Sequence, residues 1–588
     1  MGAFLALLWD DQDPQAGCEA EALKSRVTGA GWTTAHKGRA AQVWLRGAGR
    51  LEIQEAERAL VVGACLRRGE TQTYRPREAT PDLAPAAIAS TFCRDAWGAY
   101  VVLLDGRWVF RDPSGGLDCL TWEVGRVRLV TSDAGWPPPG LQPPRCALDW
   151  RVIAGWCQDS SRGATQAGLA GVVVVEPGSL LEWAGGGPSQ HLIWRPSRFV
   201  GVAPASPGEI GEGLRHAVGV AVDGLAKGHE RLLQELSGGL DSAVVAAAGV
   251  ERGLAPRIGA SLNYFGDRPE GDERLHAKAV ADQLGLTLRC VGKPLLPLTE
   301  ADFEVAAKGL RPGFATIDPV RDRDTAARLR AAGATGLVTG HGGDAVFFQM
   351  PNLAIAADRR REAGLRGLTG GFLEDIARLT RRPIWEVLRA AFAKDEKGAG
   401  YRPPTLGRAH SETYAWIDPW TADCSAAPPA KRLQVRALHR AHLAMGWSHR
   451  GLEADVIHPL LSQPVMEFCL GLTTTQLTQG GRDRVVAREA YRGRLPDLVI
   501  DRRSKGDLTA HYGRVIAASL GFLRPLLLEG CLVEAGLLDR RKLEATLTPE
   551  QLMLTRANSE ILVAAVIESW VRWWQTRVPD APQGQRRL

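Results

Sequence analysis

The chain has 588 residues, of which 45% are hydrophobic and 23% are charged, and its formal net charge is +6. This length exceeds what one hydrophobic core supports, so at least two globular domains are expected. No dense basic stripe of the kind that binds nucleic acid is present, and short clusters such as Arg359–Arg361 are typical of solvated helix faces. Nucleic acid is therefore not an expected partner.

The cysteines and the apolar runs indicate a cytoplasmic protein. Ten cysteines are spread from Cys18 to Cys531 without a C-x-x-C pair, a pattern that favours reduced thiols over a zinc ribbon or a disulfide scaffold. The opening stretch MGAFLALLWDDQD has no basic residue before its apolar run, so it predicts a first strand and not a signal peptide. No stretch approaches the ~20 apolar residues of a membrane span, and no membrane partner is expected.

The N-terminal third is predicted to be rich in β-structure. Residues 99–112 and 171–183 carry Asp-Gly and Pro-Gly turns between apolar runs, and each is predicted to form a hairpin. Residues 195–209 are rich in Pro, Ser and Gly, which indicates a linker. These patterns predict two domains, covering residues 1–203 and 204–588.

Beyond the linker, short apolar strands alternate with helices. Residues 258–264 are predicted to form a strand ahead of a helix at 272–285, and residues 335–340 form another strand ahead of a glycine turn. Strands separated by helices indicate a parallel sheet with right-handed crossovers. After residue 430 the chain is predicted to be mostly helical, ending with ILVAAVIESWVRWW at 561–574.

The segment LLQELSGGLDSAVVAAA (232–248) combines a buried strand, a tight turn and a helix start. Gly238 and Gly239 allow backbone N–H groups to approach a ligand closely, and a helix N-terminus favours an anion. This phosphate cradle is not a Walker loop, because no Gly-Lys-Ser/Thr follows. Asp241 would repel a bare phosphate, which predicts a divalent cation between them. Taken alone, the turn is equally compatible with an ordinary strand-to-helix connection.

Several motifs together resemble the asparagine synthetase family of AMP-forming ATP pyrophosphatases. SGGLDS (237–242) resembles its pyrophosphate-binding loop, and VTGHGGDAVF (338–347) its second nucleotide-binding signature. Further resemblance lies in HPLLSQPVMEF (458–468), GGRDRVVAREAYRGRLP (480–496) and RRSKGDL (502–508), and WGAYVVLLDGRWVFRDPSGG (97–116) resembles a hairpin of the family's glutaminase domain. The resemblance covers most of the chain and is weak at residues 350–430.

The resemblance implies both the fold and the cofactors. The fold would be an α+β glutaminase-like sandwich of two antiparallel sheets between helices, followed by an α/β ATP-pyrophosphatase domain with a parallel sheet and a helical C-terminal part. ATP and Mg²⁺ would be the cofactors, with Asp241 and Asp344 as metal ligands. Lys505 would lie against the reacting carbonyl and the α-phosphate, where a cation stabilises the transition state. The expected nucleotide-binding residues are Leu236, Ser237, Gly238, Gly239, Leu240, Asp241, Ser242, Leu262, Asn263, Thr339, Gly340, Gly342 and Gly343.

Two departures from the family bear on its chemistry. Gly2 stands where glutamine-dependent members carry a nucleophilic cysteine, and Cys18 lies in a predicted acidic loop, so the glutaminase is expected to be inactive. His341 replaces a glutamate of asparagine synthetases and a tyrosine of β-lactam-forming relatives. It is a candidate base for an attacking amine, oriented by Glu374 or Asp375, and a structural histidine is the alternative.

Other histidines and the P-F-L-D segment give weaker signals. HPLLSQPVMEF (458–468) resembles the family's P-F-L-D segment, but Ser462 stands where that segment has its acid. Ile457 stands where the family usually has an arginine, two residues before the proline. His439 and His442 have the i, i+3 spacing of a helix but no nearby acid at useful spacing, so they are predicted to be exposed helix histidines and not metal ligands.

An inactive glutaminase requires another source of nitrogen, as in β-lactam and carbapenam synthetases and in lasso peptide cyclases. GHGGDA, PLLSQP and ARLTRRPIWEVLR (377–389) resemble lasso peptide cyclases most. That resemblance implies adenylation of an Asp or Glu side chain of a precursor core peptide and closure of a macrolactam by its α-amine, with AMP and pyrophosphate released. A leader-binding protein and a leader peptidase are the implied partners.

Alternatives remain open at this point, and one region is singled out for the substrate. The alternatives are a β-lactam or carbapenam-type synthetase, an ammonia-dependent asparagine synthetase, and a non-catalytic nucleotide-binding scaffold.

A peptide substrate needs a larger and more apolar cavity than aspartate does. Its walls are predicted in the weakly matching region, from Phe348, Trp385, Tyr401 and Trp416, with ordinary core packing as the alternative.

Overall fold

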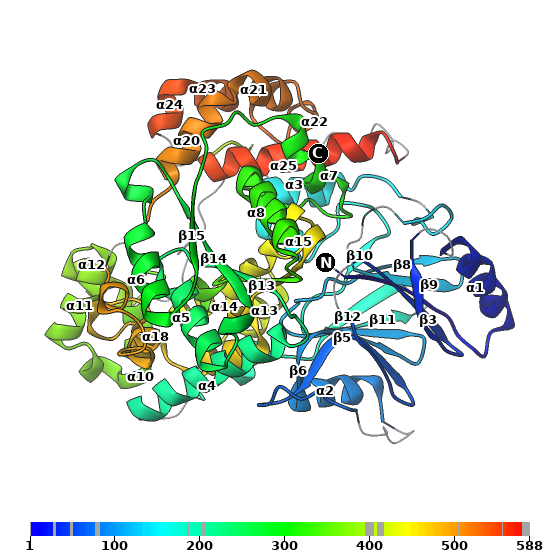
Figure 1. The fold of residues 1–588 in the computed structure, drawn as a ribbon, viewed down its shortest axis with the longest axis horizontal. Coiled ribbons are helices and arrows are strands. Elements are labelled where there is room, and N and C mark those ends of the chain that lie inside the picture. Colours follow the sequence, from blue (N-terminus) through cyan, green and yellow to red (C-terminus); the bar gives the residue numbers. More distant parts are fainter. Residues whose placement is uncertain are drawn as a thin grey trace.

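The computed structural model describes residues 2–27, 31–47, 51–76, 83–132, 135, 137–144, 146–184, 187–202, 206–393, 405–407, 417–503, 506–554 and 557–578. Two antiparallel sheets form the N-terminal part, and one parallel sheet lies at the centre of the C-terminal part (Figure 1).

The first antiparallel sheet has the strand order β10-β8-β9-β1-β3-β2 and the second has the order β12-β11-β7-β6-β5-β4. The strands are β1 (Ala3–Leu8), β2 (Thr33–Lys37), β3 (Ala41–Arg46), β4 (Ile53–Glu55), β5 (Ala59–Arg67), β6 (Ala96–Leu104), β7 (Trp108–Arg111), β8 (Leu120–Val124), β9 (Val127–Thr131), β10 (Val173–Val174), β11 (Ser179–Ala184) and β12 (Gly187–Leu192). The predicted first strand, β1, is buried at the centre of its sheet.

Alternation of side chains gives each sheet two packed faces. Phe4 and Ala6 of β1 pack with Val62 and Val101 between the sheets, while Leu5 and Leu7 point to the other face. There they meet α1 (Pro14–Val27) and α3 (Trp150–Gln158), and α2 (Pro85–Asp95) covers the outer face of the second sheet. The resulting order of helix, sheet, sheet and helix is the expected four-layer sandwich.

One of the two predicted hairpins is correct. β6 and β7 pair antiparallel around Asp105 and Gly106, which both have positive φ. The predicted hairpin at 171–183 is wrong, because β10 pairs with β8 in one sheet and β11 pairs with β7 and β12 in the other. The runs on both sides of the Pro-Gly turn are largely buried, so their pairing is decided by tertiary packing. Cys18, expected in a loop, lies in helix α1 and is exposed.

The predicted parallel sheet is present in the C-terminal part. Its strands are β13 (Leu232–Glu235), β14 (Ile258–Phe265), β15 (Leu288–Gly292), β16 (Gly336–Val338) and β17 (Asp455–Ile457), in the order β15-β14-β13-β16-β17. Every neighbouring pair is parallel. The carboxyl ends of all five strands therefore lie along one edge, which is where open α/β sheets bind ligands.

Helices account for most of the remaining C-terminal part, as predicted. They are α4 (Pro207–Ala226), α5 (Leu240–Glu251), α6 (Arg274–Leu284), α7 (Glu300–Lys308), α8 (Pro319–Ala332), α9 (Gly343–Val346), α10 (Ala354–Ala363), α11 (Gly370–Thr380), α12 (Ile384–Ala391), α13 (Pro419–Asp423), α14 (Pro429–Ala441), α15 (His449–Glu453), α16 (Gln463–Gly471), α17 (Thr474–Leu477), α18 (Val485–Ala490), α19 (Asp497–Ile500), α20 (Thr509–Ala518), α21 (Leu520–Leu528), α22 (Cys531–Glu534), α23 (Arg540–Thr546), α24 (Pro549–Leu554) and α25 (Asn558–Gln575). Among the described residues no single helix is long and apolar enough to span a membrane, and one bent pair, Thr509–Ala518 with Leu520–Glu534, passes by length and composition alone.

Buried polar groups and aromatic rings join the two parts. Glu467 on α16 accepts hydrogen bonds from the indole of Trp194 (2.8 Å) and from Arg68. Trp570 on α25 packs edge-to-face on Trp156 of α3, with ring centroids 5.2 Å apart. The first contact joins α16 to the N-terminal part, and the second places α25 against α3 of the sandwich (Figure 1).

Candidate active site

Two glycine turns meet at the carboxyl edge of the parallel sheet. SGG (237–239) links β13 to α5, and TGHG (339–342) links the adjacent strand β16 to α9. The turns lie so close that a Cβ atom added at Gly343 would collide with the Asp241 side chain. Only glycine permits this approach, so both signatures contribute to one cavity of about 360 Å³.

Two serine hydroxyls brace the first turn. Ser242 Oγ accepts a hydrogen bond from the backbone N–H of Ser237 (3.1 Å), and Ser237 Oγ accepts one from Gly239 N–H (3.2 Å). Gly238 has a φ of +84°, which a side chain would strain. Gly239, the N-cap of α5, supplies no side-chain cap, so the helix start is open to an anion in the cavity.

Most of the predicted nucleotide-binding residues line this cavity, and the others support it. The lining includes Ser237, Gly239, Leu240, Asp241, Ser242, Leu262, Gly340, His341, Gly342, Gly343 and Asp344. Leu236, Asn263 and Thr339 are buried behind it: the Asn263 amide donates to the Leu236 carbonyl (2.9 Å), and Thr339 Oγ1 lies 2.7 Å from His458 Nδ1. Gly238 belongs to the turn but is not among the lining residues.

The two predicted metal-binding carboxylates lie on either side of an arginine. Arg484 Nη1 is 3.2 Å from Asp241 Oδ2 and 3.9 Å from Asp344 Oδ1. One cationic group therefore already reaches both acids, and these two carboxylates are the residues that would hold a divalent cation. No group of three or more His, Cys, Asp or Glu side chains that could hold a metal occurs among the described residues. Phosphate oxygens and water would have to complete the coordination, as is usual for Mg²⁺.

Arg484 is a site residue that sequence reasoning missed. It precedes α18 with a φ of +54°, a left-handed conformation that is uncommon for a residue with a side chain. Its side chain is buried although it carries a charge. Arg484 lies in the motif GGRDRVVAREA, which already resembled the family. A positive charge directly before a helix in that motif was the feature by which the sequence could have identified it.

A second arginine contacts the SGG turn (237–239) itself. Arg502 Nη1 donates to the Gly238 carbonyl (3.2 Å) and to Glu273 Oε1 (2.6 Å), and Glu273 also accepts from Gly506 N–H (3.0 Å). Arg502 and Glu273 both line the cavity. Lys505, the predicted catalytic lysine, lies outside the described residues, and its role stays a prediction.

His341 lines the cavity with a defined tautomer. Its Nε2 lies 2.9 Å from the Ala441 carbonyl, which can only accept, so Nε2 carries the proton and Nδ1 the lone pair. Burial lowers the pKa of His341 and keeps the ring neutral. The suggested orienting acids are wrong, because Ala441 is the ring's partner while Glu374 and Asp375 pair with Arg378 on α11.

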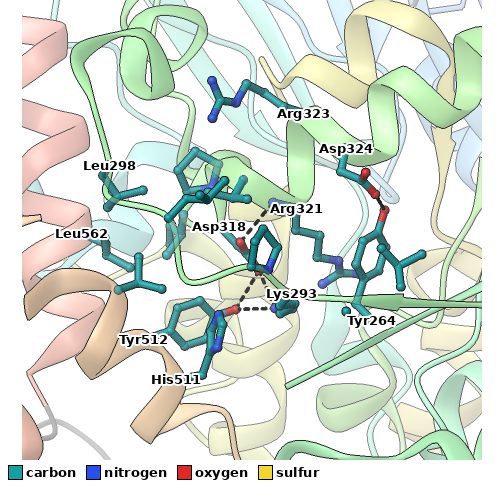
Figure 2. A pocket seen from close by; sticks show the side chains of 18 of the residues that line it. Tyr264, Lys293, Leu298, Asp318, Arg321, Arg323, Asp324, His511, Tyr512 and Leu562 are labelled. Atoms are coloured by element: carbon teal, nitrogen blue, oxygen red, sulfur yellow. Dashed lines mark hydrogen bonds and ion pairs between the residues drawn. The ribbon is translucent and has the colours of Figure 1, made fainter. Parts of the chain in front are cut away.

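Figure 2 shows a second cavity, of about 470 Å³. It adjoins the cavity at the glycine turns, which we call the nucleotide cavity because most of the predicted nucleotide-binding residues line it. Tyr264, Lys293 and Arg321 line both cavities. The second cavity is otherwise formed by the end of β15 and the segment that follows it, by α8 and the two residues before it, and by α20 and α25. Lys293 directly follows β15, so it extends from the same sheet edge as the two glycine turns.

A buried charge network lies where the cavities meet. Lys293 Nζ is 2.6 Å from Asp318 Oδ2 and 3.1 Å from the Tyr512 hydroxyl, which itself donates to Asp318 (2.8 Å; Figure 2). Burial lowers the pKa of Lys293 while Asp318 partly restores it. Arg321 pairs with Glu235 (2.7 Å): burial raises the pKa of Glu235, but Arg321 and Arg450 lower it overall.

The predicted cavity walls in residues 350–430 are not the walls of this second cavity. Phe348 is fully buried in the core behind the sheet, with a φ of +66°, and Trp385 is exposed on α12. Tyr401 and Trp416 lie outside the described residues. The error arose because aromatic content cannot distinguish core, surface and cavity positions.

Two further expectations concern histidines and the N-terminus. His439 and His442 were predicted to be exposed, but they are buried against Trp420, since α14 packs inside the molecule.

Gly2 is buried and its backbone N–H donates to Asp455 Oδ1 (3.3 Å) at the start of β17. The inactivity of the glutaminase stays a prediction.

The sequence-family model described as asparagine synthase matches residues 213–572, and no curated protein matches the chain. The similar solved structures include the allosteric regulatory enzyme of purine biosynthesis (10% identity over 50% of this chain and 76% of that one, TM-score 0.19). A second is the U34-tRNA thiolase NcsA from Methanococcus maripaludis, with 17% identity over 33% of this chain and 67% of that one and a TM-score of 0.16. A third is a glutamine phosphoribosylpyrophosphate amidotransferase from B. subtilis, with 11% identity over 68% of this chain and 94% of that one and a TM-score of 0.18.

Proposed function

Because the chain belongs to the asparagine synthase family and is an ATP-dependent carbon–nitrogen ligase, we propose that it is a lasso peptide cyclase. It would adenylate an Asp or Glu side chain of a precursor core peptide and join that carboxyl to the peptide's own α-amine. Membership of the family indicates ATP-dependent amide-bond formation, and the peptide substrate and the ring closure are the proposal. The predicted boundary between 1–203 and 204–588 and the proposed leader-binding and leader-peptidase partners likewise remain proposals.

The observation that carries the proposal is the second cavity. Its volume of about 470 Å³ lies in the range of pockets that hold ligands much larger than one amino acid. Leu296, Leu298, Val515 and Leu562 are among its lining residues, and such apolar walls suit a peptide better than free aspartate. Lys293 and Arg321 line both cavities and are paired with Asp318 and Glu235, and in this proposal both also contact the substrate carboxylate beside the phosphates.

The steps of the proposed reaction follow this layout. The peptide carboxylate, steered by Lys293 and Arg321, attacks the α-phosphorus of ATP, and pyrophosphate leaves from the α5 turn. The α-amine then attacks the acyl carbon, AMP leaves, and the amine loses a proton. His341 Nδ1 is the base proposed for that proton. Magnesium, held by Asp241 and Asp344, would neutralise charge on the leaving pyrophosphate.

Mass spectrometry tests the proposal directly. The protein would be incubated with ATP, Mg²⁺ and a leaderless peptide that has an acid at about its seventh to ninth position, so that the amine and acid can be oriented for ring closure. The expected product is lighter by one water, and the same peptide with Asn or Gln at that position stays linear. Lys293→Met should weaken turnover of the acidic peptide.

Two outcomes would overturn this proposal. Pyrophosphate release with free aspartate or a small β-amino acid, while cognate peptides stay linear, would favour an asparagine or β-lactam-type synthetase. Nucleotide binding without pyrophosphate release for any substrate would indicate a scaffold. Glutamate formed from glutamine above background would show that the N-terminal part retains glutaminase activity despite Gly2.

A further inference from the structure

Helix α12 presents a second apolar face to solvent. Val387 and Ala391 bury one face. On another, Ile384, Trp385 and Leu388, with Phe392 directly after the helix, have exposed fractions of 43%, 68%, 42% and 49%. We call these four side chains the α12 patch. The 384, 388, 392 spacing places three of them along one line of the helix, and contiguous exposed apolar side chains of this size mark interaction surfaces.

The α12 patch is surrounded by positive charge. Residues 359–392 contain eight arginines and four acids. Arg381, Arg382 and Arg389 are exposed on or beside α12, and the Arg360 guanidinium lies 5.1 Å from the centre of the Phe392 ring. Of the acids, Glu374 and Glu386 are paired with Arg378 (3.1 Å) and Arg382 (3.8 Å). The surface therefore complements a ligand that is apolar on one side and negatively charged around it.

The patch is connected to the candidate active site through one neighbouring helix. Helix α11 packs on α12 and on the 3-10 turn Gln479–Gly481. A Cβ atom at Gly481 would lie 2.8 Å from the Asp375 carbonyl oxygen of α11. Arg484, between the two acids of the site, follows that turn by three residues. Helices α10, α11 and α12 lie on the side of the molecule away from the N-terminal sandwich (Figure 1).

We propose that the α12 patch docks a partner protein through an acidic amphipathic segment. Apolar side chains of the segment cover Trp385 and its neighbours, and flanking carboxylates pair with the arginines. A helix-in-groove or helix-on-helix arrangement suits a line of anchors at i, i+4 and i+8. The α12 patch lies outside the two candidate cavities, so docking of this segment is independent of which carboxylate the enzyme activates.

Two labelled peptides of equal length test the charge and apolar requirements on the full-length protein. One has Leu at helical i, i+3, i+4 positions and Glu elsewhere, and the other has Lys in place of Glu. We expect the acidic peptide to bind at least ~10-fold more tightly by fluorescence anisotropy, and its affinity to fall with added salt. The double variant Trp385→Ser/Phe392→Ser and the double variant Arg381→Glu/Arg389→Glu should each weaken it at least ~10-fold.

Matched controls keep the test decisive. Leu275→Ser/Leu554→Ser removes two comparably exposed apolar side chains, 68% and 79% exposed, on α6 and α24. Arg151→Glu/Arg541→Glu reverses two exposed charges elsewhere. Both controls should bind like the wild type, and all variants should keep the wild-type unfolding temperature and ATP-dependent pyrophosphate release.

Three results would overturn the proposal. The first is equal binding of the acidic and basic peptides, or binding that the patch variants leave unchanged. The second is a dimer in sedimentation velocity that the patch variants dissociate, which would make a second copy the occupant. The third is patch-dependent binding to phosphatidylcholine–phosphatidylglycerol vesicles without binding of the acidic peptide, which would make a lipid surface the occupant.

Discussion

Arg484 and Asp241 form a buried ion pair, 3.2 Å long, at the point where the two glycine turns meet. The guanidinium is also 3.9 Å from Asp344, so one cation contacts both carboxylates that are proposed to bind magnesium. In the proposed reaction this group would balance the charge of the acids before ATP binds, and it would contact a phosphate once magnesium neutralises the acids.

Arg484→Ala is therefore expected to lower ATP-dependent pyrophosphate release by roughly 100-fold, since one fixed donor near developing charge has about that effect. Arg484→Lys keeps the charge and should retain more of the rate. The measurement is a coupled pyrophosphate assay at saturating ATP and magnesium. A rate within a few-fold of wild type for the alanine variant would limit Arg484 to a structural role.

Asp241→Asn and Asp344→Asn test the proposed metal ligands. Each should reduce pyrophosphate release by ~100-fold or more and raise the magnesium concentration needed for half-maximal rate, because a neutral amide neutralises less of the cation's charge. Asp282→Asn, which removes an exposed acid paired with Lys278 on α6, is the control. ADP and phosphate as products would contradict the assignment of the whole site.

His341→Ala separates the two half-reactions. If Nδ1 accepts the amine's proton, adenylation measured by ATP–pyrophosphate exchange should stay within about threefold of wild type. Amide formation should fall by roughly 100-fold, in the usual range for a general base. Equal loss in both assays would mean that the ring only supports the turn, through its contacts with the Ala441 carbonyl and the His458 ring.

His458 and His341 predict a loss of stability in acid. Burial lowers the pKa of both rings, and His458 also lies 5.1 Å from His341. Their folded-state pKa lies below the unfolded value of about 6.5, so the unfolded chain binds more protons below that pH. Stability is thus fully present above about pH 6.5 and falls as the pH drops, by up to ~1.4 kcal/mol per unit for each ring. The urea midpoint should fall between pH 7 and 5, and His458→Asn should flatten this dependence.

Glu467→Ala tests the junction of the two parts. The substitution leaves the buried Trp194 indole N–H without its acceptor and removes the partner of Arg68. A cost of about 2 kcal/mol or more is expected for an unsatisfied buried donor, seen as a lower unfolding temperature. Glu453→Ala, which removes an exposed pair with Arg330, should cost less than ~1 kcal/mol. Equal effects would show that the junction adds little stability.

Much of the site was predictable because its signals are local. The turn at 237–239, its helix and the strand before it follow from glycine conformation and from apolar runs of strand and helix length. The same reasoning predicted the parallel sheet, and a parallel sheet brings the carboxyl ends of β13 and β16 to one edge. The proximity of Asp241 and Asp344, which are far apart in the chain, therefore follows from two local patterns and the geometry of a parallel sheet.

Tertiary structure decided which non-local groups join that edge. Arg484, Arg502 and Lys293 reach the site from three segments whose local patterns resemble ordinary surface charge, and burial beside fixed acids is what distinguishes them. In the same way, Phe348 and Trp385 are both large apolar residues, yet one is core and the other surface. Local sequence specifies backbone conformation because steric limits act within a few residues. Pairing, burial and exposure depend on which distant elements pack against a given face, and that information exists only in the folded chain.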